Sequence, residues 1–164
     1  MHKKRRAKQV DILIICGVIL ALIIFVSSIV YTRVSRPVRQ AKAEATQIAQ
    51  RAANIETVEN FYWFTRDETY FSIVGLDNKE EEMIVIIPQS GNKITILQQS
   101  EGLTENEARR MVKKNHPEEA VKKANLGVVD EKIVWEVMTE NDAGIMYYLI
   151  DFKEGQEIDA LQII

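Results

Sequence analysis

The chain has 164 residues and a formal net charge of −3, a length that allows one ordinary domain or two small ones. The charge is uneven: residues 1–39 carry eight Lys or Arg and one acid, whereas residues 40–164 carry thirteen Lys or Arg against twenty-three Asp or Glu. A part this acidic argues against nucleic acid as a partner, because it lacks the basic surface that neutralises phosphates. The single cysteine, Cys16, lies in an apolar run, so the rest of the chain has no disulfide, thiol nucleophile or cysteine-based metal site.

Residues 12–30 form an uncharged run of nineteen residues, fourteen of which are Ile, Leu, Val or Phe. As a helix this run would span roughly 28 Å, close to the hydrocarbon thickness of a bilayer. A cleaved signal peptide usually has a shorter apolar region that ends in small residues, and a lipoprotein signal has small residues before its cysteine. Because neither pattern is present, we predict a transmembrane anchor at residues 12–31 that contacts the lipid bilayer, preceded by a basic tail at residues 1–11.

The charges on either side of the run predict its orientation. Five Lys or Arg precede it within residues 3–8, and four follow it within residues 33–42. The positive-inside rule therefore favours a cytoplasmic N-terminus. We expect a single-pass protein of the cell membrane whose C-terminal part folds outside the cytoplasm.

The soluble part begins with a predicted helix at residues 38–54, for which Pro37 suits the first turn. Short runs of β-branched and aromatic residues separated by turn residues then predict strands at residues 58–64, 69–75, 82–87 and 93–98.

A second predicted helix starts at Thr104, which forms a capping box with Glu107, and it ends at His116 because Pro117 follows. Four more strands are predicted at residues 120–129, 132–139, 145–152 and 157–163.

The two halves of this part match each other when the sequence is shifted by 64 residues without a gap. The shift sets Phe71 over Trp135, Val85 over Leu149 and Leu97 over Leu161. With the same order of elements in both halves, it predicts an internal duplication. The expected fold class is α+β, with the transmembrane helix followed by two tandem helix-on-antiparallel-sheet units at residues 37–100 and 101–164.

The second half contains Val-Trp-Glu-Val at residues 134–137, a strand at residues 147–152 that includes Asp151, and Gly-Gln-Glu-Ile at residues 155–158. This order resembles the PepSY signature. The whole layout resembles the YpmB/TseB-like family of cell wall elongation regulators from Gram-positive bacteria, which have two cystatin-like units. The chain departs from that pattern at Ile86, where an aromatic residue is expected, and at Ile87, which the ungapped shift aligns with Asp151.

This resemblance implies a non-enzymatic extracytoplasmic protein that binds a penicillin-binding transpeptidase and so regulates peptidoglycan synthesis. Two alternatives need the same anchored binding surface: a PepSY-type peptidase inhibitor or chaperone, and a sensor of cell wall fragments.

Residue patterns give no catalytic, cofactor or metal site. His116, at a helix end, is expected to be solvated and to meet the helix dipole, and no second histidine outside the tail is available for zinc. Glu80, Glu81 and Glu82 suit a solvated loop. Asp151 and Glu136 would act together only if they met in space, and a structural role such as closing a turn is the simpler expectation for them.

The candidate partner-binding residues are aromatic and acidic. In a strand, alternate residues face opposite sides, so one pair from the run at residues 61–64 must point away from the first helix. That pair either packs one unit on the other or forms an aromatic patch for a partner. The candidates for partner binding are Phe61, Tyr62, Trp63, Phe64, Trp135 and Asp151.

Overall fold

The computed structural model describes the backbone of residues 2–91 and 93–163, and the side chains of residues 17–27, 36–91 and 93–162. The chain divides into two compact units, residues 1–41 and residues 42–164. The first unit belongs to the helix α1, His2–Ala53, which contains Pro37 in its interior. The predicted helix start at Pro37 is therefore wrong. A proline removes only one backbone N–H, and the helix continues on both sides of it.

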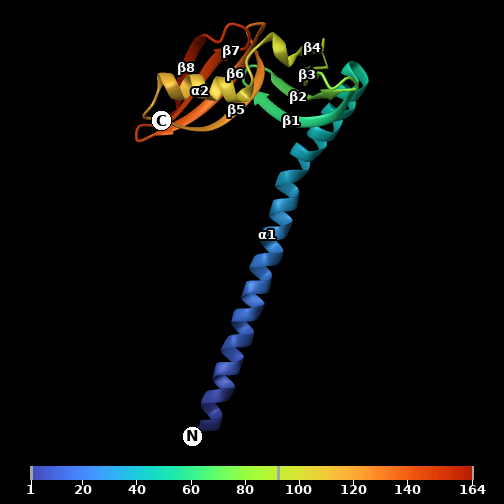
Figure 1. Ribbon diagram of the computed structural model, residues 1–164. Helices are drawn as coiled ribbons and strands as arrows, with labels where there is room; N and C mark the ends of the chain where they lie inside the picture. The colour runs from blue at the N-terminus through green and yellow to red at the C-terminus, as the bar shows by residue number, and fades with distance from the viewer. Residues whose placement is uncertain (1, 92, 164) are drawn as a thin grey trace. The chain divides into compact units, whose positions relative to one another are not determined.

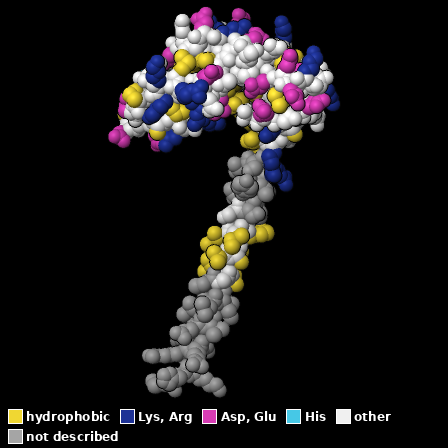
Figure 2. Space-filling view, viewed as in Figure 1, with side chains coloured by type: hydrophobic (Ala, Val, Ile, Leu, Met, Phe, Trp, Pro, Cys, Tyr) yellow, Lys and Arg dark blue, Asp and Glu magenta, His cyan; other side chains and the backbone are white. Residues whose placement is uncertain are grey.

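Residues 17–27 of α1 expose every side chain, and most of these side chains are large and apolar (Figure 2). Within the described part of the chain, no helix is both long and apolar enough to cross a membrane. The predicted anchor at residues 12–31 lies partly outside the described residues, because the side chains of residues 12–16 and 28–31 are not among them.

The second unit contains two four-stranded antiparallel sheets with helices, which confirms the predicted α+β class (Figure 1). The first sheet has the order β1-β2-β3-β4, and its strands are Ile55–Thr65, Thr69–Asp77, Glu82–Pro88 and Thr95–Gln98. The second sheet has the order β5-β6-β7-β8, and its strands are Ala120–Val129, Lys132–Asn141, Gly144–Asp151 and Glu157–Ile163. A short 3-10 turn, η1 (Gln99–Glu101), and the helix α2 (Glu105–Asn115) connect the sheets.

The capping box at the start of α2 is present as predicted. The Thr104 side chain accepts a hydrogen bond from the Glu107 backbone N–H, and the Glu107 carboxylate accepts one from the Thr104 backbone N–H at 2.9 Å. His116 is the C-terminal cap of the helix, so the predicted end is also correct.

Each helix covers one face of a sheet. Ala45 and Ala49 of α1 pack with Ile73, Val85 and Ile87 of the first sheet, where small alanines allow a close approach. On the second sheet, Ala108 and Val112 of α2 share a core with residues of β6 and β7, namely Trp135, Val137, Tyr148 and Ile150.

The other face of the first sheet is covered by the second half of the chain. Val74, Ile84 and Leu97 are buried on this face, in the same core cluster as Leu126 of β5. The Ser72 hydroxyl, fully buried, donates a hydrogen bond to the Leu126 carbonyl at 2.8 Å. The two sheets therefore share one continuous core, and strand β5 lies against β1 and β2.

The strand pairing corrects the ungapped 64-residue match. Phe71 pairs with Ile87, but Trp135 pairs with Ile150 rather than with Asp151. The chain between Trp135 and Ile150 is one residue shorter than the chain between Phe71 and Ile87, and a one-residue slip moves each side chain to the other face of the sheet. Asp151 therefore corresponds to Pro88, not to Ile87.

Candidate functional site

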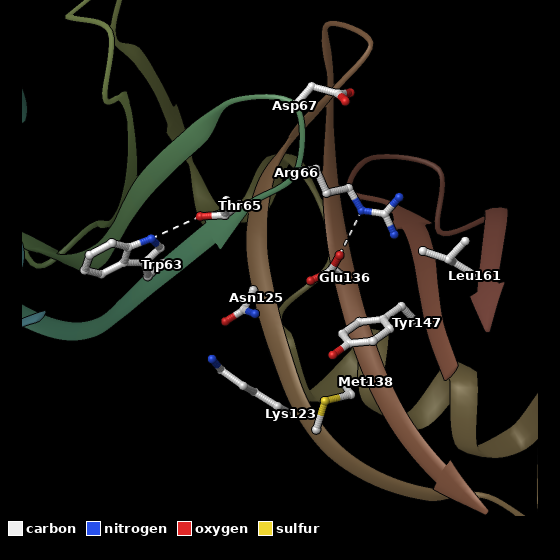
Figure 3. Close-up of a pocket in the computed structure, with 10 residues that line it drawn as sticks. All are labelled: Trp63, Thr65, Arg66, Asp67, Lys123, Asn125, Glu136, Met138, Tyr147 and Leu161. Atoms are coloured by element: carbon white, nitrogen blue, oxygen red, sulfur yellow. Dashed lines mark hydrogen bonds and ion pairs between the residues drawn. The ribbon is translucent and has the colours of Figure 1, made fainter. Parts of the chain in front are cut away.

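A groove of about 570 Å³ lies on the face of the second sheet opposite α2 (Figure 3). Residues alternate across a strand, so Trp135 and Val137 face α2 while Glu136 and Met138 face the groove. The groove crosses all four strands of this sheet and is flanked by the end of β1. Its lining residues are Trp63, Thr65, Arg66, Asp67, Lys123, Asn125, Glu136, Met138, Tyr147 and Leu161.

An ion pair between the two halves of the chain lies in the groove. The Arg66 Nε donates to Glu136 Oε2 at 2.9 Å, and the two side chains are 21% and 10% exposed. Arg66 comes from the turn that follows β1, whereas Glu136 is in the middle of β6. Because both side chains are mostly buried, water screens this ion pair less than it screens a pair on the surface, and the attraction is stronger. The dashed line between Arg66 and Glu136 in Figure 3 marks this contact, in which the terminal nitrogens of Arg66 take no part.

Tyr62 and Phe64 point away from α1 and are buried between the sheets. The Tyr62 ring meets the Trp135 ring edge to face, with centroids 5.1 Å apart, and its hydroxyl donates to Glu105 Oε2 at 2.9 Å. Burial, followed by the hydrogen bond and the charge of Glu105, raises the pKa of Tyr62 above its ordinary value. Phe64 packs with Val134 and Leu149 and is fully buried.

Phe61 and Trp63 lie on the α1 side of β1 and are half-buried. Phe61 stacks on Phe71 at 6.2 Å between centroids, and Trp63 meets Phe71 edge to face at 5.1 Å. The Trp63 indole donates to Thr65 Oγ1 at 3.1 Å and the residue lines the groove. The expected alternation is therefore correct, and the pair that points away from the helix packs the two halves together.

Trp135 and Asp151 have structural partners. Trp135 is 1% exposed and its indole donates to the Leu103 carbonyl at 2.8 Å. Asp151 Oδ1 accepts from the backbone N–H groups of Lys153 and Glu154, each at 2.8 Å, so it closes the turn before β8. The Glu136 carboxylate instead accepts from Arg66, so each of the two acids has a partner of its own. Partner binding stays a prediction for all six candidates, but only Phe61, Trp63 and Asp151 have accessible side chains.

The sequence did not indicate the buried carboxylate Glu119, which is 5% exposed. It accepts hydrogen bonds from Asn141 Nδ2 and the Tyr148 hydroxyl, each at 3.0 Å, and from the Thr139 hydroxyl. All three donors come from β6 and β7, far away in sequence, so no local pattern distinguishes Glu119 from a solvated loop acid.

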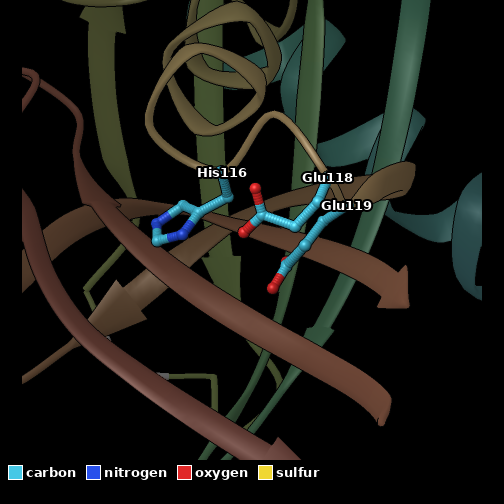
Figure 4. A group of neighbouring side chains, drawn as sticks. All are labelled: His116, Glu118 and Glu119. Carbon is cyan, nitrogen blue, oxygen red and sulfur yellow. The ribbon is translucent and has the colours of Figure 1, made fainter. Parts of the chain in front are cut away.

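His116 lies beside this cluster and differs from its expected solvated state (Figure 4). Its ring stacks on Tyr148 at 4.1 Å between centroids, and its Nε2 lies 3.2 Å from Glu157 Oε2. His116, Glu118 and Glu119 lie close enough together to hold a metal ion. The Glu119 oxygens already accept three hydrogen bonds, so the arrangement suits a structural network that joins α2 to β7 and β8.

Two family models match the chain. The cell wall elongation regulator TseB-like domain matches residues 44–88, and the peptidase propeptide and YPEB domain, PepSY, matches residues 102–161. The chain is similar to the probable cell wall elongation regulator TseB of Bacillus subtilis strain 168, with 24% identity over 154 residues that cover 92% of this chain and 95% of that protein. Its fold is similar to that of the YpmB protein from Bacillus subtilis, with a TM-score of 0.65 and 21% identity over 74% of this chain and 96% of the other. These matches, in the order that the two sheets follow, support a TseB/YpmB-like family for this chain.

Proposed function

We propose that this protein is a non-catalytic, membrane-anchored extracytoplasmic regulator of cell wall elongation that acts by binding a penicillin-binding transpeptidase. The observation that carries the proposal is the match to a probable cell wall elongation regulator over nearly the whole length of both proteins. Because 92% of this chain is covered, the match extends beyond the two sheets into the N-terminal helix α1.

The exposed surface of α1 supports the membrane anchor. Eight large apolar side chains between residues 18 and 26 are each more than half exposed. Leaving apolar surface in water costs about 25 cal/mol per Å², so an apolar surface around a whole helix favours a lipid environment. The uncharged run from residue 12 to residue 30 has the length that such an anchor needs.

The groove supports a binding role. Its buried acid Glu136 is engaged by Arg66, an ion pair that fixes the polar centre of the groove. Apolar side chains from three strands, Met138, Tyr147 and Leu161, line the same groove. A concave, partly apolar surface with a fixed polar centre is typical of an interaction site.

The test is co-purification from native membranes. The full-length protein, tagged at its C-terminus, is crosslinked in cells and isolated, and the captured proteins are labelled with a fluorescent penicillin. We expect a labelled penicillin-binding protein in the sample. A protein whose anchor is replaced by an unrelated transmembrane helix should still capture it, since the anchor supplies only location. Absence of any labelled protein from the crosslinked sample would refute the transpeptidase link.

The PepSY match favours a second candidate, because that domain family is named for peptidase propeptides. In this case the same groove binds a peptidase. Inhibition of an extracellular peptidase by the anchored protein, without capture of a penicillin-binding protein, would favour this candidate.

A further inference from the structure

The groove is the counterpart, in the second sheet, of a face that is occupied in the first sheet. In the first sheet Tyr62 pairs with Ser72, and in the second Asn125 pairs with Glu136. Further along the first sheet, Val74 pairs with Ile84, and Ile84 pairs with Leu97. In the same way in the second sheet, Met138 pairs with Tyr147, and Tyr147 pairs with Leu161. The corresponding positions are therefore Tyr62 and Asn125, Ser72 and Glu136, Val74 and Met138, Ile84 and Tyr147, and Leu97 and Leu161.

These counterparts differ in what covers them. In the first sheet the five positions are at most 7% exposed, because strand β5, helix α2 and their neighbours pack on them. In the second sheet all five positions line the open groove, and Leu161 is 49% exposed where its counterpart Leu97 is 6% exposed. The fold therefore presents one docking face that is filled and an equivalent face that is not.

The filled face shows what kind of element it holds. The element across β1 and β2 is β5, an edge strand of the other sheet. Gly127 of this strand lies directly under the Phe64 ring, and the Ser72 hydroxyl donates to the Leu126 carbonyl. An extended backbone with a small residue at the contact thus fits the part of this face that β1 and β2 form.

The polar centre of the open groove offers the same kind of contact. Glu136, the counterpart of Ser72, holds the Arg66 guanidinium through its Nε. A guanidinium has further N–H donors at its terminal nitrogens, which are suited to a carbonyl or carboxylate oxygen. Arg66 would therefore give an incoming backbone carbonyl the donor that Ser72 gives to Leu126.

We propose that the groove binds an extended β-strand segment of a partner protein, as the first sheet binds β5. This inference rests on the proposed function, for which it names the binding surface and the shape of the bound segment. The segment has small or apolar side chains against Met138, Tyr147 and Leu161, and a backbone carbonyl that accepts from Arg66. Because Glu136 already balances the charge of Arg66, the exposed cation Lys123 favours an acidic side chain in the segment.

The test uses the full-length protein in native membranes with a photocrosslinking amino acid at position 161. A matched control carries it at Ile96, which is 43% exposed on the edge strand of the first sheet. Position 161 should capture a cell wall synthesis protein, and mass spectrometry of the adduct identifies the bound segment. That segment is then synthesised, and each residue is replaced in turn while binding to the full-length protein in nanodiscs is measured. A bound strand predicts that every second replacement weakens binding.

A charge change gives a second readout. Lys123→Glu should weaken binding of the segment about tenfold, and replacing the acid of the segment by Lys should restore it. Lys122→Glu, one residue away and outside the groove lining, should change binding by less than about twofold. Thermal unfolding of each variant checks that the fold is kept.

Several outcomes would overturn the inference. Adducts with the cell wall synthesis protein at position 96 but not at position 161 would agree with the proposed function and would show that the groove is not the binding surface. Adducts at position 161 with a second copy of this chain would show that the groove binds another copy and not a partner protein. Replacements that weaken binding at every third or fourth position would show that the bound segment is a helix and not a strand. No adduct with a wall synthesis protein at either position would count against the proposed function itself.

Discussion

Gly127 shows how a single small residue fixes the contact between the two sheets. A Cβ atom at this position would lie 2.1 Å from Cγ of Phe64, well inside van der Waals contact. Phe64 is fully buried against Val134 and Leu149, so its ring has no free space to move into. Only glycine allows the ring and the β5 backbone to lie so close.

Gly127→Ala should therefore destabilise the protein by about 1–3 kcal/mol, the usual cost of overpacking a core. Urea unfolding of the purified protein measures the change. Phe64→Ala in the same chain removes the Cγ and Cδ1 atoms that lie nearest to the added Cβ, so the double variant should lose less stability than the sum of the two single variants. Additive losses would show that the Phe64 ring is not what excludes a side chain at residue 127.

The stability that Tyr148 gives to the buried Glu119 network depends on pH. Burial, followed by the hydrogen bond from its hydroxyl to Glu119 and the charge of that residue, raises the pKa of Tyr148 to about 12. The pKa of a tyrosine in the unfolded chain is about 10, so the folded state holds the proton more tightly. The contribution to stability is complete below about pH 10 and is lost as the pH rises toward 12.

Tyr148→Phe removes this contribution. We expect its free energy of unfolding to fall less steeply than that of the unchanged protein between about pH 10 and 12. Urea unfolding at several pH values in this window compares the two proteins, and lysine titration affects both equally. Parallel curves would show that Tyr148 titrates alike in the folded and unfolded states.

At the scale of elements, turns with an acidic acceptor close two hairpins in the same way. Asp77 Oδ1 accepts from the backbone N–H groups of Lys79 and Glu81, and Asp151 Oδ1 accepts from those of Lys153 and Glu154. An Asx-type turn needs an acceptor oxygen and does not need a charge. Asp151 thus has a role that is independent of any partner.

Asp151→Ala should cost about 1–2 kcal/mol in stability, whereas Asp151→Asn, which keeps an acceptor oxygen, should cost much less. Thermal unfolding measures both, and Asp77→Ala provides the equivalent change in the first sheet. If Asp151→Asn were as unstable as Asp151→Ala, the charge itself would be the stabilising feature. If Asp151→Asn kept the stability of the unchanged protein but no longer captured the penicillin-binding protein, Asp151 would have a binding role as well as closing the turn.

At the scale of the whole molecule, the Arg66–Glu136 pair connects the turn after β1 to the centre of the second sheet. Hydrogen bonds between charged, partly buried groups contribute about 1.5–3 kcal/mol each. A double-mutant cycle with Arg66→Gln and Glu136→Gln should therefore give a coupling energy of about 1–3 kcal/mol.

The matched control is the surface pair Lys122–Glu140, whose side chains are 45% and 54% exposed with 2.7 Å between Nζ and Oε2. Its cycle should give less than about 1 kcal/mol, because water screens exposed charges. Similar coupling energies for the two pairs would mean that the groove pair is as solvated as the surface pair.

Local patterns predicted the order of the elements in residues 42–164, and they placed some bounds correctly. The strands Ala120–Val129 and Glu157–Ile163 begin and end as predicted, as does the start of α2 after its capping box. Such signals work because capping, turn residues and strand alternation depend on neighbours along the chain. The helix start at Pro37 and the ungapped alignment of β3 with β7 were wrong, since a proline inside a helix and a hairpin one residue shorter leave little trace in a pattern.

The sequence by itself determined the uneven charge, the apolar run, the α+β class and the repeated sheet, because each is a matter of composition and short periods. Only the tertiary structure decided that Tyr62 and Phe64 pack inward, that Arg66 meets Glu136, that Glu119 is buried, and that one of two equivalent sheet faces stays open. These features join residues far apart along the chain, and a contact of that kind exists only when the two sheets have packed against each other.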